Sequence, residues 1–212
     1  VQTGDVVATV THSFIATANA ARFVGAEPVF VDIDPGTLNI DPVKLETFIE
    51  QEFEAREDGL WYRDISRLAH GESPLSRSTG PRGRLAAFLI VHQVGMPADM
   101  DAIVKIANDY NLPVIADGAA ALGATYKGRL SGNLGADLTI YSFNGNKTVT
   151  AGGGGAVVGK KVDLVKLVRH LTTTAKVGEG YHHDRIGFNY RMTNIAAAVG
   201  CAQMELLEKF VG

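Results

Sequence analysis

The sequence predicts an α/β domain with a largely parallel sheet. Two observations lead to this prediction: short apolar runs recur along the chain, and stretches with helical spacing lie between them. Most of the runs are apolar throughout, as expected of strands that helices cover on both faces. With 212 residues, 46% of them hydrophobic and 20% charged, the chain can form one substantial core.

Six apolar runs are predicted to be strands. They are Val6 to Val10, Pro28 to Val31, Leu85 to Val91, Pro113 to Ile115, Leu138 to Tyr141 and Ala156 to Val158. Four stretches between or after them have helical features. They are the stretch that begins at Asp41 and Pro42, then Asp99 to Tyr110, Val162 to Leu171 and Asn194 to Val211. Asp41 is a typical N-cap and Pro42 a typical first-turn residue.

Composition excludes several classes of protein. No apolar run approaches the ~20 residues that a membrane span needs, and a net charge of −3 does not predict a nucleic-acid partner. Cys201 is the only cysteine, so no intrachain disulfide can form. This favours a reducing compartment, the cytoplasm. The alanine-rich pattern around Cys201 predicts a small core residue.

Residues 54–84 interrupt the alternation of strands and helices. This segment has no sustained period and is rich in Arg, Gly, Ser and acidic residues. A long irregular segment within a compact domain is usually an insertion or a lid. We expect a solvated insertion here, with a lid that contacts substrate as the alternative.

Two residues that follow predicted strands stand out chemically. In open α/β sheets, ligands bind beyond the carboxyl ends of the strands. Asp117 follows one apolar run and is succeeded by small residues, and Lys147 follows the next run in a segment of turn and small residues. Partial burial would make such a lysine amine nucleophilic, and amines of this kind form Schiff bases with aldehydes. A lysine and a carboxylate are the pair that a pyridoxal-phosphate enzyme requires. The spacing alone also fits two unrelated surface residues.

The literal residues point to a family. The segment Ser142-Phe-Asn-Gly-Asn-Lys147, followed by the glycine run 152–155, closely resembles the lysine segment of the nucleotide-sugar aminotransferases of the DegT/StrS family. Further matching segments extend over nearly the whole chain. They are Ser13 to Ala20, Pro28 to Asp34, Thr37 to Pro42, Val91 to Met100, Leu112 to Asp117 and His183 to Asn194. Leu171 to Lys176 further resembles the branch that acts on 4-keto-6-deoxy sugar nucleotides.

The resemblance implies a fold and a set of roles. The fold would be the large domain of a fold-type-I pyridoxal-phosphate transferase, covering residues 1–212. Lys147 would hold pyridoxal 5'-phosphate and move the reacting proton, and Asp117 would pair with the pyridine nitrogen. Phe14 would stack on the cofactor ring, and Ser142 would donate to its phosphate. Asn189 would reach the phosphate in a neighbouring subunit, so the active site of a homodimer would lie at the subunit interface.

The activity that the resemblance implies is a transamination. An amino group, with glutamate as the expected donor, would move to a keto group, expected at C4, of a nucleotide-linked deoxysugar. Two alternatives remain: a sugar dehydrase of the same family and a non-catalytic paralogue that binds sugar nucleotides. Such dehydrases usually have histidine in place of Lys147. Ala120 keeps the paralogue open, because the family usually has a polar side chain at this position, near the cofactor's phenolic oxygen.

The resemblance also implies further polypeptide before Val1 and after Gly212. A phosphate-binding helix start would lie upstream of Val1, and a smaller C-terminal domain would follow Gly212. We therefore expect the 212 residues to be an incomplete large domain that binds cofactor weakly by itself.

Three other patterns in the sequence have simpler explanations. Residues 154–161 resemble a phosphate-binding P-loop but have Lys161 where Ser or Thr is needed, so the glycines are expected to allow close backbone packing instead. Glu179, His182 and His183 match no zinc spacing, and no metal site is expected. His92, at a strand end, is predicted to be a buried histidine with satisfied hydrogen bonds.

Overall fold

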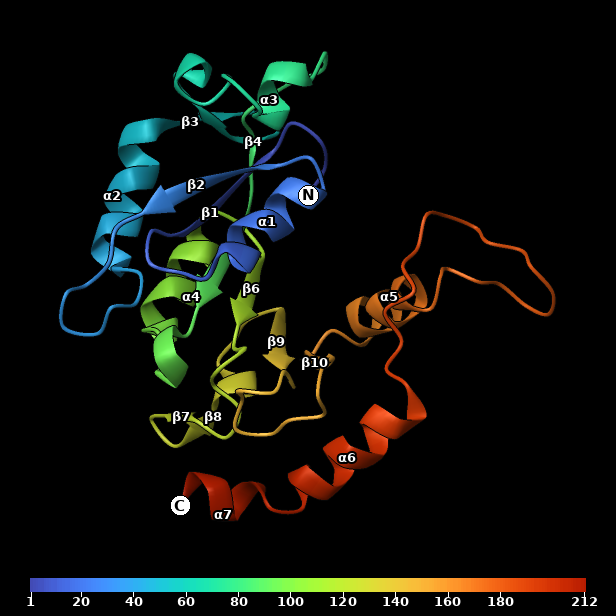
Figure 1. Ribbon diagram of the computed structural model, residues 1–212. Coiled ribbons are helices and arrows are strands. Elements are labelled where there is room, and N and C mark those ends of the chain that lie inside the picture. Colours follow the sequence, from blue (N-terminus) through green and yellow to red (C-terminus); the bar gives the residue numbers. More distant parts are fainter.

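The computed structural model describes residues 1–212 and confirms the α/β fold (Figure 1). Its central sheet has six strands in the order β10-β9-β6-β5-β1-β2. The strands are β1 (Val6–Val10), β2 (Glu27–Val31), β5 (Leu85–Val91), β6 (Val114–Asp117), β9 (Leu138–Ser142) and β10 (Gly155–Val158). The first five run parallel, and β10 is an antiparallel edge strand against β9. All six predicted strands are confirmed; β1 and β5 have the predicted bounds, and the bounds of the other four shift by one or two residues.

Three predicted helices are confirmed, those that begin at residues 42, 100 and 162, whereas the helices at residues 15–23 and 74–77 were not predicted. The structure has seven α-helices. They are α1 (Ile15–Phe23), α2 (Pro42–Glu52), α3 (Pro74–Arg77), α4 (Met100–Asp109), α5 (Val162–Thr172), α6 (Asn194–Met204) and α7 (Leu207–Val211). The carboxylate of Asp41 caps α2 by accepting the N–H groups of Val43 at 2.9 Å and Lys44 at 3.3 Å. None of the helices combines the length and apolar character needed to cross a membrane.

Two expectations about the C-terminal helical stretch are wrong. Instead of one helix over residues 194–211, the chain breaks between α6 and α7. The Leu206 N–H donates to the Gln203 carbonyl at 3.1 Å, an i→i+3 bond that tightens the end of α6 and turns the chain. Cys201, predicted to be a core residue, is exposed, because α6 packs little of its surface against the sheet.

The two faces of the sheet are covered unequally. One face packs against α2 and α4 and forms a core of 22 buried residues, including Phe88, Ile90 and Ile103. The other face packs against α1, and its core has only four buried residues, Val7, Ala21, Ala26 and Leu89. The helix α1 is therefore held to the sheet by few apolar side chains.

The strand order places a topological switch point at the carboxyl edge of the sheet. From β1 the chain crosses to β2 on one side, and it later returns to β5 on the other side of β1. The loops after β1 and β5 therefore diverge, which is the arrangement that favours ligand binding in open α/β sheets. Phe14 follows β1 and His92 follows β5, so both lie at this switch point.

Residues 54–84 are more structured and more buried than the sequence predicts. They complete a hairpin of β3 (Phe53–Arg56) and β4 (Gly59–Tyr62), followed by a 3₁₀ turn and α3. Trp61, Tyr62 and Leu75 are buried, so the expectation of a solvated insertion is wrong for these residues. Trp61 bridges to Arg84, directly before β5. The segment thus packs at the amino-terminal edge of the sheet and does not cover Lys147 of its own chain.

Candidate active site

Asp117 is the last residue of β6, and two donors hold its carboxylate. Oδ1 accepts the backbone N–H of Ala119 at 3.1 Å, and Oδ2 accepts the hydroxyl of Thr17 at 2.8 Å. The Gly118 N–H donates to the carbonyl of Ile140 on β9 at 2.9 Å, which fixes the start of the following loop. The Asp117 side chain is half-buried. Its remaining lone pairs are therefore available to a ligand at this edge.

Helix α1 places Phe14 near Asp117, at the carboxyl edge of the sheet. Phe14 is the N-cap residue of α1, and its side chain is 79% exposed. Its carbonyl accepts the N–H of Thr17 at 3.1 Å, and the Thr17 hydroxyl in turn reaches Asp117. An exposed aromatic ring and a carboxylate are thus connected through one residue of the first helical turn. Sequence reasoning did not identify Thr17, because nothing local indicates a contact with a residue 100 positions away.

Lys147 lies in the loop that joins β9 to β10. Two hydrogen bonds close this loop: the Ala151 N–H donates to the Phe143 carbonyl at 2.9 Å, and the Phe143 N–H donates to the Gly154 carbonyl at 3.0 Å. Within it, the Lys147 N–H donates to the Asn144 carbonyl at 3.0 Å. The Lys147 side chain is half-buried, and its amine takes part in none of the ion pairs of the structure. Since β9 and β6 are adjacent and parallel, this loop and Asp117 lie at the same edge.

Ser142 ends β9, at the start of the lysine loop. Its Oγ accepts the N–H of Asn144 at 3.2 Å, so the hydroxyl proton remains available to a ligand. A side chain added at Gly145 or at Gly152 would meet no atom within 4 Å. The lysine loop therefore has open space at these two glycines.

The glycine run allows close packing, as the sequence predicts. A Cβ atom at Gly155 would lie 2.3 Å from the Tyr141 carbonyl oxygen of the paired strand. Residues 155–158 form β10, and their backbone groups pair with those of β9 in an antiparallel ladder. A P-loop needs these groups free for phosphate, so the structure excludes a P-loop in this segment.

His92 is buried as predicted, but its hydrogen bonds are not all satisfied. Nδ1 accepts the Ala98 N–H at 3.3 Å, which places the ring proton of the neutral imidazole on Nε2. That Nε2 group has no partner, and neither has Nε2 of the neighbouring Gln93. Burial lowers the pKa of His92 to about 4, and the negative charge of Asp117 opposes this shift only in part. His92 is therefore an uncharged donor close to the carboxylate.

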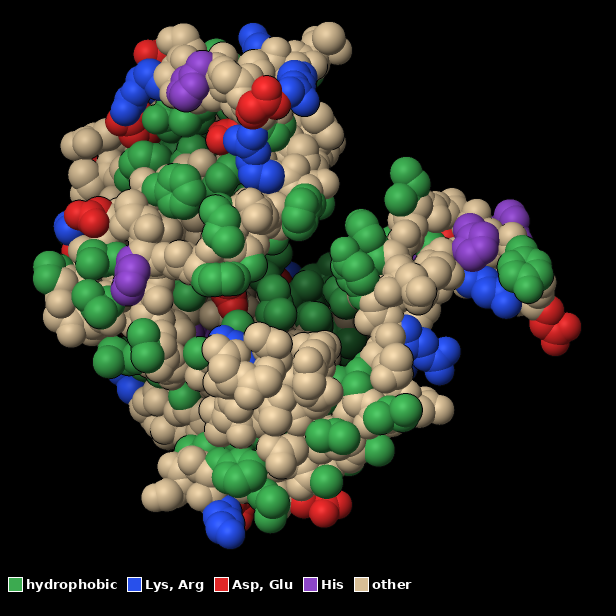
Figure 2. Space-filling view, in the orientation of Figure 1, with side chains coloured by type: hydrophobic (Ala, Val, Ile, Leu, Met, Phe, Trp, Pro, Cys, Tyr) green, Lys and Arg blue, Asp and Glu red, His purple; other side chains and the backbone are tan.

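Asn189 lies apart from the other four predicted site residues. It belongs to a projecting arm, residues 162–193, which comprises α5 and the segment after it (Figure 1). Asn189 is exposed, and its backbone pairs with that of Thr173. Figure 2 shows hydrophobic side chains on the walls of the hollow between the arm and the main body. The structure thus groups Phe14, Asp117, Ser142 and Lys147 at one edge and leaves Asn189 outside that group.

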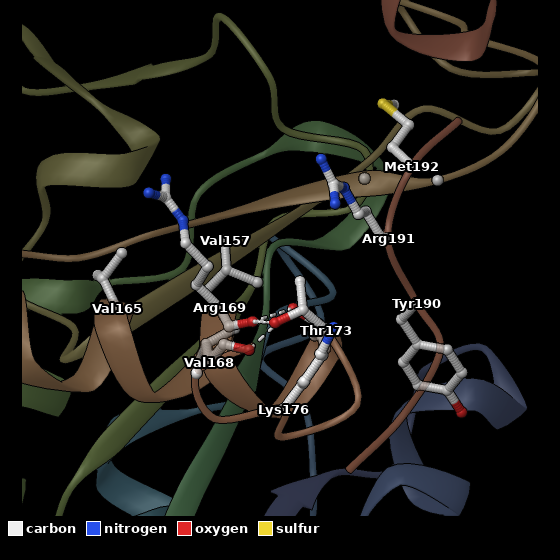
Figure 3. Close-up of a pocket in the computed structure, with 13 residues that line it drawn as sticks. Val157, Val165, Val168, Arg169, Thr173, Lys176, Tyr190, Arg191 and Met192 are labelled. Carbon is white, nitrogen blue, oxygen red and sulfur yellow. Dashed lines mark hydrogen bonds between the residues drawn. The ribbon is translucent and has the colours of Figure 1, made fainter. Parts of the chain in front are cut away.

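A separate pocket of about 850 Å³ lies between β10, α5 and the end of the arm (Figure 3). Its basic lining residues are Arg169, Lys176 and Arg191. In Figure 3 the guanidinium groups of Arg169 and Arg191 lie on different sides of the pocket, and Lys176 lies near Thr173. None of the five predicted site residues lines this pocket, so it is distinct from the candidate active site.

Known proteins resemble this chain over almost its whole length. Over 212 residues the chain is 38% identical to the GDP-perosamine synthase of Caulobacter vibrioides, covering 97% of this chain and 47% of that protein. Over 206 residues it is 33% identical to the UDP-4-amino-4,6-dideoxy-N-acetyl-β-L-altrosamine transaminase of Campylobacter jejuni, covering 96% and 46%. The chain thus spans about half the length of the curated relatives it matches.

A solved structure shows the same fold. The crystal structure of a DegT DnrJ EryC1 StrS aminotransferase from Brucella abortus matches 98% of this chain and 49% of its own, with a TM-score of 0.81 and 28% sequence identity. The profile of the DegT/DnrJ/EryC1/StrS aminotransferase family matches residues 1–212. The chain therefore belongs to the DegT/DnrJ/EryC1/StrS aminotransferase family.

Proposed function

We propose that this protein transfers an amino group from glutamate to the C4 keto group of a nucleotide-linked deoxysugar. Aminotransferases of this family depend on pyridoxal phosphate. The observation that carries the proposal is the placement of a free lysine amine and an oriented carboxylate at the ends of adjacent parallel strands. The C4 assignment rests on the relative whose name specifies a 4-amino sugar.

The residues at the carboxyl edge fit such a cofactor. Lys147 presents an amine without an ion-pair partner, and His92 presents a buried N–H without an acceptor. Donors in need of an acceptor favour an anionic ligand that carries oxygen atoms. Phe14 adds an exposed ring, and Asp117 can accept the N–H of a protonated pyridine. We therefore propose that Phe14, Asp117, Ser142 and Lys147 hold pyridoxal phosphate.

Each residue has a distinct role in the proposed reaction. When bound, the cofactor supplies an electron sink for the carbanion that forms when the donor's α-carbon loses its proton. Asp117 keeps a proton on the pyridine nitrogen, without which that sink is weak. The Lys147 amine holds the cofactor between turnovers and, once displaced, moves the proton to and from the reacting carbon. The Ser142 hydroxyl donates to the phosphate, and the Phe14 ring shields one face from water.

Covalent trapping tests the role of Lys147. Borohydride reduction of the whole protein with pyridoxal phosphate, followed by peptide mass analysis, should show a pyridoxyl group on Lys147. The variant Lys147→Ala should lose the adduct, and its amino transfer should fall at least about 100-fold, the lower end of what a positioned acid–base group contributes. Lys160→Ala, at an exposed lysine just after β10, is the matched control. Without a Lys147 adduct the enzyme assignment fails, and a non-catalytic paralogue that binds sugar nucleotides becomes the better explanation.

A panel of substrates tests the sugar. Keto-sugar nucleotides with the keto group at C3 or at C4 are supplied with glutamate, and release of 2-oxoglutarate is measured. We expect release with the C4 compounds. Turnover of the C3 compounds alone would contradict the C4 assignment and leave the transamination intact.

We also propose a cytoplasmic homodimer with the active site at the subunit interface. Tyr181, Ile186 and Tyr190 are exposed on the arm that carries Asn189, and exposed apolar side chains in one segment favour a contact with another chain. In such a dimer Asn189 would reach the cofactor phosphate of the partner. Cys201, an exposed and unpaired thiol, is compatible with a reducing compartment.

Subunit complementation tests the shared site. Lys147→Ala and Asn189→Ala subunits are mixed under conditions that exchange them. If each site uses Lys147 from one chain and Asn189 from the other, a mixed dimer contains one intact site, and random mixing restores about a quarter of the wild-type activity. No recovery of activity would show that both residues serve the same chain's site.

A further inference from the structure

We propose that Thr17 is a positioning residue for Asp117 and that Ser13 fixes Thr17 in this role. The three side chains form a hydrogen-bonded relay across the carboxyl edge of the sheet. The Ser13 hydroxyl donates to Thr17 Oγ1 at 2.7 Å, and the Thr17 hydroxyl donates to Asp117 Oδ2 at 2.8 Å. This inference rests on the proposed function, because Asp117 has a ligand to orient only if the cofactor binds at this edge.

The direction of the relay follows from the number of protons. A hydroxyl has one proton to donate, and that of Thr17 goes to the carboxylate. Thr17 Oγ1 then acts as an acceptor toward Ser13, which restricts rotation of the Thr17 side chain. Hydrogen bonds in such a chain polarise and strengthen one another, and the terminal bond to an ionised group is the strongest type.

The surroundings of Thr17 favour this role over a merely local one. Thr17 is 4% exposed, so water does not compete for its hydroxyl. It lies in the first turn of α1, whose N-cap residue Phe14 makes no side-chain capping bond. A threonine in a helix usually bonds to a carbonyl of its own helix or faces solvent. Here the hydroxyl instead donates to Asp117, the last residue of strand β6.

The relay would orient the carboxylate toward the cofactor. The Ala119 N–H holds Oδ1 and the Thr17 hydroxyl holds Oδ2, so the carboxylate plane is fixed at two points. Only one of these donors is a side chain that substitution can remove. The relay also ties α1 to β6, and it thereby fixes the spacing between the exposed Phe14 ring and Asp117. Small errors in such spacing weaken catalysis strongly.

Three variants test the relay in the whole protein. Thr17→Val removes the hydroxyl at nearly constant volume, Thr17→Ser retains it, and Ser13→Ala removes only the outer donor. Thr37→Val is the matched control, because Thr37 also donates to a carboxylate, that of Asp34 at 2.9 Å, at an exposed turn outside the site. The measurements are cofactor affinity, the pH midpoint of the visible absorbance of the bound cofactor, kcat and KM, and the melting temperature without cofactor.

Thr17→Val should weaken cofactor binding and lower kcat, each on the order of tenfold, as expected for the loss of a hydrogen bond to a charged group. It should also move the pH midpoint of the absorbance, which a purely structural residue would leave in place. KM for the sugar should change little, Thr17→Ser should behave as the wild type, and Ser13→Ala should move the midpoint by a smaller amount in the same direction.

A wild-type midpoint and affinity in Thr17→Val would overturn the relay while the Lys147 adduct still supports the proposed function. Absence of the adduct from the wild-type protein would overturn both. If Thr17→Val does not fold, Ser13→Ala decides the question. An unchanged pH midpoint in Ser13→Ala would show that the hydrogen-bonded chain from Ser13 through Thr17 to Asp117 does not act as a relay.

Discussion

At the scale of the residue, His92 combines deep burial with an unsatisfied group. Its ring is 1% exposed at the end of the central strand β5, and Nε2 has no acceptor. A buried donor without a partner costs about 1–3 kcal/mol, so the fold tolerates a local loss of stability next to Asp117. A buried group without a partner calls for a physical explanation, and a ligand that accepts the N–H would supply one.

The depressed pKa of His92 makes stability depend on pH. The unfolded chain binds a proton near the ordinary value of 6.5, whereas the folded chain binds it near 4. The contribution of His92 to stability is therefore complete above pH 6.5 and is lost as the pH falls toward 4, by about 3 kcal/mol in total. Urea unfolding between pH 7.5 and 4.5 should show this loss in the wild type and a shallower dependence in His92→Asn.

A matched control separates this effect from general acid sensitivity. His12 is exposed, so His12→Asn should retain the wild-type pH dependence. If His92→Asn and the wild type lose equal free energy over this window, His92 does not carry the effect.

The candidate site shows what local sequence can reveal about single residues. Asp117 and Lys147 can be found because each follows an apolar run, and parallel strands bring their carboxyl ends to one edge. Thr17 and the unsatisfied Nε2 of His92 cannot be found in this way. Both depend on contacts between distant parts of the chain, and no periodic pattern encodes those contacts. Ser13 precedes α1 and Thr17 lies in its first turn, but only the fold shows which distant residue the Thr17 side chain contacts.

At the scale of the element, the pairing of β9 with β10 determines how the lysine loop is closed. Gly155 pairs with Ser142 of β9, and an added methyl group would meet the Tyr141 carbonyl oxygen at 2.3 Å. We expect Gly155→Ala to lower the free energy of unfolding by about 1–3 kcal/mol, because the strands must separate to accommodate it. Chemical denaturation measures the change.

The neighbouring Gly153 provides the control, since an added carbon there meets no atom within 4 Å. Gly153→Ala should leave stability within about 0.5 kcal/mol of the wild type. Equal effects of the two substitutions would mean that chain flexibility, and not the contact with Tyr141, determines the loss.

At the scale of the whole molecule, residues 54–84 are part of the fold. Leu75, from α3, is 0% exposed and belongs to the core of 22 residues that α2 and α4 share with the sheet. Leu75→Ala should lower the free energy of unfolding by about 2–5 kcal/mol, the usual range for a buried leucine. Leu130→Ala, at an exposed position, should cost far less. A loss below about 1 kcal/mol for Leu75→Ala would mean that the segment packs only loosely.

The central sheet could be predicted from the sequence more completely than the structure of residues 54–84. Strand β5 is apolar at every position and β1 at every position except Thr9, and a buried parallel sheet requires nearly continuous apolar runs. In residues 54–84 the buried pair Trp61-Tyr62 is separated from the buried Leu75 by polar turns. Isolated buried residues of this kind do not repeat at a helical or strand spacing. The sequence therefore contains no periodic pattern from which their burial could be predicted.

The thin cover on one face of the sheet has a consequence for motion. Helix α1, which carries Phe14 and Thr17, is anchored by a core of four residues, whereas α4 shares in the core of 22. Regions with few buried apolar contacts open locally at lower free energy than the molecule as a whole. Amide hydrogens of α1 should therefore exchange with solvent faster than those of α4. A ligand that contacts α1 would slow that exchange, because it stabilises only the closed form.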